Sequence, residues 1–221
     1  GEPREAIVAL SMLESGNWIL PVNYGTDIAY KPPFFYWSIA AVSSLFGEVT
    51  EFSARFPSAL AFLAMQLLFF AFQTAFLASI LLLSSFEVHR AAVACRVDMV
   101  QVAFIVISLC LLFRWDEKGC RGVPWLAVLL MGCATLTKGP VGSIFPCACI
   151  GVYQLLRGRS FGKAFFSLVG IGLLSFVPYL AWVYVAYRQG GQPFLDLVLE
   201  ENTGRFMGKM SYESHENPVI S

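Results

Sequence analysis

Uncharged apolar runs separated by short charged segments make up most of the chain. Residues 164–187 form a run of 24 residues without a formal charge, which is enough for one membrane helix of about 20 residues. Residues 122–137 and 139–156 are shorter uncharged runs that share Lys138 between them. This pattern predicts a pair of short apolar helices that form a hairpin with Lys138 at its tip.

Residues 56–86 form an uncharged run of 31 residues. One continuous helix of that length would measure about 46 Å, which is too long for one span and too short for two. The run is therefore either a tight hairpin that turns within residues 66–74, or two helices whose connecting loop is missing from the chain as given. We favour the missing loop, because a turn without any charged residue would have no anchor at the membrane surface.

Residues 2–15 have the spacing of an amphipathic helix, with Ile7, Leu10 and Leu13 on the apolar face and Glu5 away from it. This helix is too short and too charged to cross a bilayer. Residues 17–33 follow as a loop, punctuated by glycine and proline. The next 13 residues form a second short apolar helix, rich in aromatic residues and typical of the membrane interface, at positions 34–46.

The composition is that of a membrane protein, since 57% of the residues are hydrophobic, 14% are charged and the mean hydropathy is +0.66. A net charge of zero and the absence of long runs of like charge give no reason to expect a nucleic-acid partner. Four of the six cysteines lie within apolar runs and are interpreted as buried small hydrophobic residues: Cys110, Cys133, Cys147 and Cys149.

The distribution of cations predicts the orientation in the membrane. Residues 114–122 and 157–163 each carry three Lys or Arg, and the positive-inside rule places them in the cytoplasm. All other polar segments then lie at the external surface, where cations are unusual and indicate an anionic ligand such as a lipid-linked phosphate. These external cations are Arg4, Lys31, Arg55, Arg90, Arg96, Lys138, Arg205 and Lys209.

Two acid and base pairs stand out among these segments. Asp98 follows Arg96 by two residues at the mouth of an apolar run, which is a costly place for a carboxylate unless it has a function or a partner. The alternative is a helix N-cap, with Asp98 facing the positive end of the helix dipole. Glu2 and Arg4 repeat the pairing at the start of the first helix, where a solvated helix start is the alternative.

Two lysines next to proline or glycine are further candidates for binding an anion. Lys138 precedes Gly-Pro between two apolar helices, and Lys31 precedes two prolines that restrict its backbone. Each has an alternative interpretation as a lysine that reaches the membrane interface. His89 and His215 are far apart in the sequence, and scattered histidines argue against a histidine-based zinc site.

Five segments, taken in order, resemble the N-terminal half of the GT-C fold glycosyltransferases that use lipid-linked sugars. This group includes the aminoarabinose transferases of lipid A and bacterial relatives of the protein O-mannosyltransferases. The segments are EPREAIVALSMLESGNWILPVNYG, YKPPFFYWSIAAVSSLFG, EFSARFPSALAFL, CRVDM and TLTKGPVG. The resemblance implies an all-α polytopic membrane protein, with GT-C-like transmembrane helices and external juxtamembrane amphipathic helices.

The resemblance also implies an activity and a division of the chain. The expected activity is transfer of a sugar from a polyprenyl-phosphate carrier to a lipid or protein acceptor, among membrane lipids at the periplasmic face of the bacterial inner membrane. Residues 1–50 would form an external loop with two juxtamembrane helices, residues 51–187 a transmembrane bundle, and residues 188–221 the start of the next external loop. A membrane helix before residue 1 and a C-terminal soluble domain would be absent.

Several residues take roles by this resemblance. The family's Asp-Glu-x-Arg motif stands here as residues 1–4, with Gly1 in place of Asp, so the catalytic base would be Glu2 or Asp98. Lys31 matches a phosphate-binding lysine. The other cations expected to bind the lipid phosphate are Arg4, Arg96, Lys138 and Arg205.

The resemblance leaves a divalent metal open as a cofactor. Tyr30 stands where some members have a metal-binding carboxylate, and Glu200 stands where some have a histidine ligand. Two other functions also stay open. A transporter or flippase for an anionic lipid would use the same cations, although no internal repeat is visible. A non-catalytic binder of polyprenyl phosphate would fit the loss of the leading Asp at Gly1.

Overall fold

The computed structural model describes residues 2–23, 27–29, 31–71 and 76–207, and these residues are almost entirely helical. The elements are α1 (Glu2–Ser15), β1 (Val22–Asn23), β2 (Asp27–Ile28), α2 (Phe34–Phe46), α3 (Glu51–Ala71), α4 (Phe76–Ser84), α5 (Phe86–Val93), α6 (Val97–Glu117), α7 (Trp125–Lys138), α8 (Val141–Leu156) and α9 (Phe161–Met207). The two strands form only a two-residue antiparallel pair. The prediction of an all-α protein is therefore confirmed, as are both short helices near the N-terminus.

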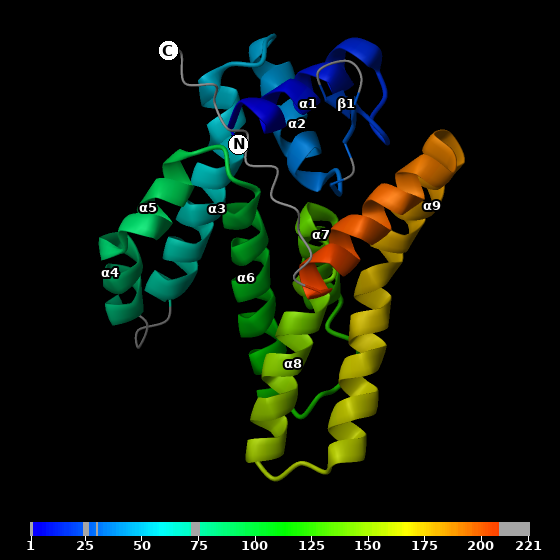
Figure 1. Ribbon diagram of the computed structural model, residues 1–221. Helices are drawn as coiled ribbons and strands as arrows, with labels where there is room; N and C mark the ends of the chain where they lie inside the picture. The colour runs from blue at the N-terminus through cyan, green and yellow to red at the C-terminus, as the bar shows by residue number, and fades with distance from the viewer. Residues whose placement is uncertain (1, 24–26, 30, 72–75, 208–221) are drawn as a thin grey trace.

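Helices α6, α7, α8 and the first half of α9 form a bundle in which consecutive helices run in opposite directions (Figure 1). Helix α7 ends at Lys138 and α8 begins at Val141, so the predicted hairpin with Lys138 near its tip is confirmed. Buried apolar residues of all four helices pack together in this bundle, among them Leu112, Met131, Ile150 and Leu168.

Among the described residues, three helices are long and apolar enough to cross a membrane: Glu51–Phe69 in α3, Val97–Glu117 in α6 and Phe161–Leu199 in α9. The predicted span at residues 164–187 lies within α9. This helix turns back on itself at Gly191, where φ is +62° (Figure 1). A Cβ at the preceding Gly190 would lie 2.6 Å from Leu20 Cδ2, so the kink packs closely on the loop after α1.

The long uncharged run forms two helices that lie side by side. Helices α3 and α4 contact each other, and Ser79 Oγ donates a hydrogen bond of 2.6 Å to Gln66 Oε1 across the pair. Of the stretch 66–74 where we expected a turn or a missing loop, residues 66–71 belong to α3 and residues 72–74 lie outside the described residues. A missing connecting segment therefore stays a prediction.

A polar cluster joins the two loops at the end of the bundle away from α1. Asp116 is buried there and accepts a hydrogen bond of 2.8 Å from Gln154 Nε2. Its Oδ1 also forms an ion pair with Arg159 Nη2 at 3.1 Å. Burial raises the pKa of the Cys120 thiol, which donates to Asp116 over 3.4 Å. Residues 114–122 and 157–163 thus lie at the same end, as predicted, and their assignment to the cytoplasm stays a prediction.

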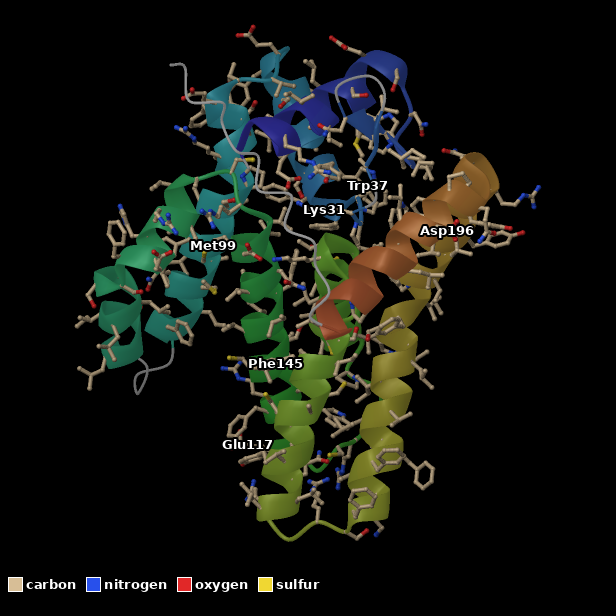
Figure 2. The ribbon with its side chains drawn as sticks, in the orientation of Figure 1. Lys31, Trp37, Met99, Glu117, Phe145 and Asp196 are labelled. Carbon is tan, nitrogen blue, oxygen red and sulfur yellow. The ribbon has the colours of Figure 1, made fainter. Side chains whose placement is uncertain are left out.

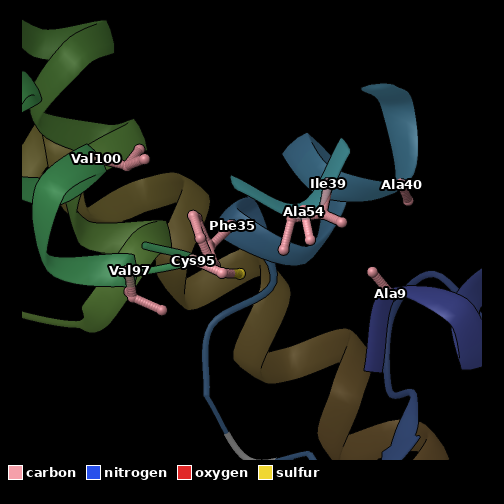
Figure 3. Packing of buried hydrophobic residues seen from close by; sticks show 8 residues of the cluster. All are labelled: Ala9, Phe35, Ile39, Ala40, Ala54, Cys95, Val97 and Val100. Atoms are coloured by element: carbon pink, nitrogen blue, oxygen red, sulfur yellow. The ribbon is translucent and has the colours of Figure 1, made fainter. Parts of the chain in front are cut away.

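The opposite end of the bundle carries α1, α2 and the strand pair (Figure 1). Phe35, Ile39 and Ala40 on the buried face of α2 pack against Ala9 of α1 and Ala54 of α3, in a cluster that extends to the start of α6 (Figure 3). The aromatic loop between α1 and α2 is fixed by two indole hydrogen bonds. Trp37 donates to the carbonyl of Trp18 over 2.7 Å, and Trp182 of α9 donates to that of Ile19 over 3.0 Å.

Candidate functional site

Lys31 forms a largely buried ion pair at this capped end. Its ammonium donates to Glu5 Oε1 at 2.7 Å, and the two side chains are 24% and 7% exposed, respectively. Pro32 and Pro33 follow Lys31 and lead directly into α2, which restricts the backbone that positions the ammonium. Figure 2 shows Lys31 above the ends of α6 and α7.

Glu5 reaches this pair because it lies on the buried face of α1. Val8, Ala9 and Met12 are fully buried, and with Glu5 they follow the i, i+3, i+4, i+7 spacing of one helix face. The predicted apolar face is therefore not the most buried one: Leu13 packs against the core, whereas Leu10 is 39% exposed. The sequence contains two apolar faces on this helix, and the buried one includes Glu5.

A second ion pair joins the ends of α6 and α7 that face the capped side. Lys138, the last residue of α7, donates to Asp98 Oδ1 in the first turn of α6. The N-cap of α6 is Arg96 rather than Asp98, but Asp98 lies in the first turn, at the positive end of the helix dipole as the alternative expected. The Asp98 side chain is 52% exposed, which leaves it accessible to a ligand.

Arg96 is exposed at the same mouth, and its backbone is fixed by Ser58 of α3. The Arg96 N–H donates to Ser58 Oγ at 3.1 Å, and Ser58 Oγ donates to the Arg96 carbonyl at 3.0 Å. Because Ser58 is fully buried, the guanidinium extends from a rigid attachment point. Arg4 is half-buried in the first turn of α1, one residue before Glu5.

The remaining candidates fall partly outside the description. Glu2 begins α1 and Arg205 belongs to the last turns of α9, but the structure describes only their backbone. Of the described candidates, it brings Asp98 together with Lys138, and it pairs Lys31 with Glu5, which we had not selected. The sequence signal for Glu5 was its helical spacing with the apolar residues Val8, Ala9 and Met12, which places it on their face of α1.

An apolar pocket of about 320 Å³ lies between α2, α3 and α6. Phe34 lines its wall three residues after Lys31 and meets Phe104 of α6 edge to face, with ring centroids 5.2 Å apart. Val100, two residues after Asp98, also lines the pocket. Its almost wholly apolar lining suits a hydrocarbon chain.

Metal binding finds no support in the described part of the chain, where no group of three or more potential ligands occurs. His89 is exposed on α5, and positions 30 and 215 lie outside the described residues.

Comparison with known proteins decides the family. A model of the family described as dolichyl-phosphate-mannose-protein mannosyltransferase matches residues 30–182, which is more than half of the chain. The chain belongs to this family. An uncharacterized protein of Aquifex aeolicus is 30% identical over 231 residues, which cover 99% of this chain and 50% of that protein. An undecaprenyl phosphate-alpha-4-amino-4-deoxy-L-arabinose arabinosyl transferase of Proteus mirabilis is 30% identical over 79% of this chain and 32% of its own length.

The solved structures confirm the fold. ArnT from Cupriavidus metallidurans, in a crystal structure bound to undecaprenyl phosphate, superposes with a TM-score of 0.77 at 23% identity, over 92% of this chain and 40% of that one. Its apo structure gives a TM-score of 0.73. The chain is thus an integral membrane protein of the GT-C type, and it spans a third to a half of the length of these relatives.

Proposed function

We propose that this chain is the N-terminal part of a membrane glycosyltransferase that moves a sugar from a polyprenyl-phosphate carrier to a lipid or protein acceptor. One observation carries the proposal: two lysine–carboxylate pairs and an apolar pocket share one end of the membrane bundle. The names of the arabinosyl transferase relatives and of the family support the same reaction class. In this proposal the site lies on the periplasmic side of the bacterial inner membrane, and the cation-rich loops at residues 114–122 and 157–163 lie on the cytoplasmic side.

Lys31 binds the carrier phosphate in this proposal. Its ammonium is a compact charge paired with the Glu5 carboxylate, and Phe34, three residues later in the sequence, lines the apolar pocket. The proposal therefore assigns the carrier phosphate to Lys31 and the isoprenoid chain to the pocket. Arg4, Arg96 and Arg205 supply further donors for a phosphate that gains charge as it leaves.

Asp98 is the proposed base. The acceptor oxygen attacks the anomeric carbon, the bond from that carbon to the phosphate oxygen breaks, and the phosphate leaves with the electron pair. Asp98 accepts the proton of the acceptor hydroxyl, and its exposure and position in the first turn of α6 suit that role. Glu2 is the second candidate for the base, as the acid of the Glu-x-Arg motif.

The proposal divides the chain into three regions. Residues 1–50 carry the external helices and Lys31, residues 51–187 form the membrane bundle, and residues 188–221 begin the next external segment. The relatives are longer than this chain, and the proposal assigns the additional length to further membrane helices and a C-terminal domain.

The test is sugar transfer from polyprenyl-phosphate donors by the full-length protein in detergent. We expect transfer by the wild type, its loss in Lys31→Ala and Asp98→Asn, and normal transfer in Lys163→Ala, which changes an exposed lysine at the other end of the bundle. Undecaprenyl phosphate should still bind to Asp98→Asn. Binding without transfer across a panel of sugars would favour a transporter or a non-catalytic binder, and a parallel assay with chelator decides whether a metal is needed.

A further inference from the structure

Glu5 carries a carboxylate oxygen that no described residue satisfies. Its Oε1 accepts from Lys31, whereas Oε2 is buried and has no hydrogen-bond partner among the described residues. Buried polar atoms in native proteins are almost always hydrogen-bonded. An unsatisfied acceptor beside a candidate ligand site therefore indicates a donor that arrives with the ligand.

The position of this oxygen is fixed by its surroundings. Glu5 is 7% exposed, and the fully buried Val8, Ala9 and Met12 continue its face of α1 into the core. The ion pair with Lys31 holds the other oxygen of the same group at 2.7 Å. Rotation of the carboxylate into solvent would break that pair, so Oε2 stays buried until a donor reaches it.

The chemistry of a lipid-linked sugar identifies the donor, provided that Lys31 binds the carrier phosphate as proposed above. The phosphate oxygen is bonded to the anomeric carbon, and the substituent on the neighbouring ring carbon is the sugar group nearest to it. Both oxygens of Glu5 are bonded to one carbon, so a donor on Oε2 lies beside the ammonium on Oε1.

We propose that Glu5 Oε2 accepts a hydrogen bond from the hydroxyl or amino group on the ring carbon next to the anomeric carbon of the lipid-linked sugar. Glu5 is then a specificity residue that recognises the loaded carrier, while Lys31 recognises the phosphate. The spent carrier has no sugar and leaves Oε2 unsatisfied again. Glu5 therefore also favours exchange of spent carrier for a loaded one.

The experiment measures binding of three probes to the full-length protein in detergent. The first probe is undecaprenyl phosphate. The second is undecaprenyl phosphate linked to mannose or aminoarabinose, whichever the wild type binds more tightly. The third is undecaprenyl phosphate linked to the 2-deoxy form of that sugar. The variants are Glu5→Gln and, as a matched control on an exposed position of the same helix, Glu14→Gln. The glutamine keeps an oxygen for Lys31 and places an amide donor where Oε2 was.

We expect the wild type and Glu14→Gln to bind the hydroxyl-bearing sugar lipid about 10-fold or more tightly than the 2-deoxy form, as for hydrogen bonds to a charged group. Glu5→Gln should lose this preference and bind undecaprenyl phosphate nearly as well as the wild type. If Glu5→Gln does not fold, the wild-type comparison of the two sugar lipids decides alone.

Two results would overturn the inference. Equal binding of the hydroxyl and 2-deoxy forms by the wild type would remove the proposed contact. A similar loss for all three probes in Glu5→Gln would show that Glu5 only supports Lys31. Failure of the proposed function looks different, because undecaprenyl phosphate itself would then bind equally well to the wild type and to Lys31→Ala.

Discussion

The buried pair between Asp116 and Arg159 gives the sharpest test of how the helix bundle is stabilised. It joins the last turn of α6 to the loop before α9, at the end opposite the candidate site. The Asp116 side chain is 1% exposed and that of Arg159 is 35% exposed, so the two partners differ in access to water. This difference predicts that the two single substitutions have unequal effects on the free energy of unfolding.

Arg159→Met leaves a charged carboxylate buried with only Gln154 and Cys120 as side-chain donors in the described structure. Removing one partner of a buried ion pair costs about 3–5 kcal/mol, and the two remaining donors place this case near 3 kcal/mol. Asp116→Asn keeps an acceptor for Gln154 and leaves a guanidinium that reaches water, so we expect a loss of about 1 kcal/mol. The double variant should be less destabilised than the sum of the two, by about 1–2 kcal/mol.

The assay is reversible unfolding of the full-length protein in mixed micelles, followed by helical content. Arg157→Met is the matched control, because Arg157 is an exposed arginine in the same loop, and its loss should change stability by no more than about 0.5 kcal/mol. The reasoning fails if Arg159→Met behaves like Arg157→Met, or if the two single effects add without coupling.

Three further predictions concern helix packing and thiol chemistry. Gly142→Ala should destabilise the α7–α8 hairpin in the same unfolding assay, because the new Cβ would lie 2.5 Å from the backbone of α7, whereas Gly162→Ala, with open space around it, should be tolerated. Ser143→Ala should cost about 1 kcal/mol by breaking the hydroxyl contacts of 2.8 and 2.7 Å to Thr135 and Ser175, and an unchanged midpoint would contradict that. Cys120 should alkylate slowly at neutral pH and faster as the pH rises, since its raised pKa keeps the thiol protonated; rapid labelling at pH 7 would refute this.

Most helices could be predicted from the spacing of charges alone. Long apolar runs must be buried in protein or in lipid. The two runs on either side of Lys138 therefore predicted both helices and the turn between them. The pairing of Lys138 with Asp98, 40 residues away in sequence, could not be read from the sequence, because it depends on α6 and α7 packing side by side.

The buried face of α1 shows why sequence periodicity failed at Glu5. In a soluble protein only one face of a surface helix is apolar, and its spacing identifies the core. Helix α1 has apolar residues on two faces, and the face of Leu10 is exposed while that of Met12 is buried. A helix at a membrane interface can satisfy both faces, so the hydrophobic pattern does not reveal which one meets the protein.

The two lysines of the candidate site share one property that links binding to catalysis. Each is paired with a carboxylate, and a phosphate that binds Lys138 competes with Asp98 for the ammonium. When the carrier phosphate binds Lys138, Asp98 loses its ion-pair partner, and its half-exposed carboxylate can contact the acceptor hydroxyl instead. Asp98→Asn should therefore abolish transfer yet bind undecaprenyl phosphate at least as tightly as the wild type, since Lys138 is then free. Weaker binding by this variant would show that Asp98 positions the lysine for phosphate instead of competing with it.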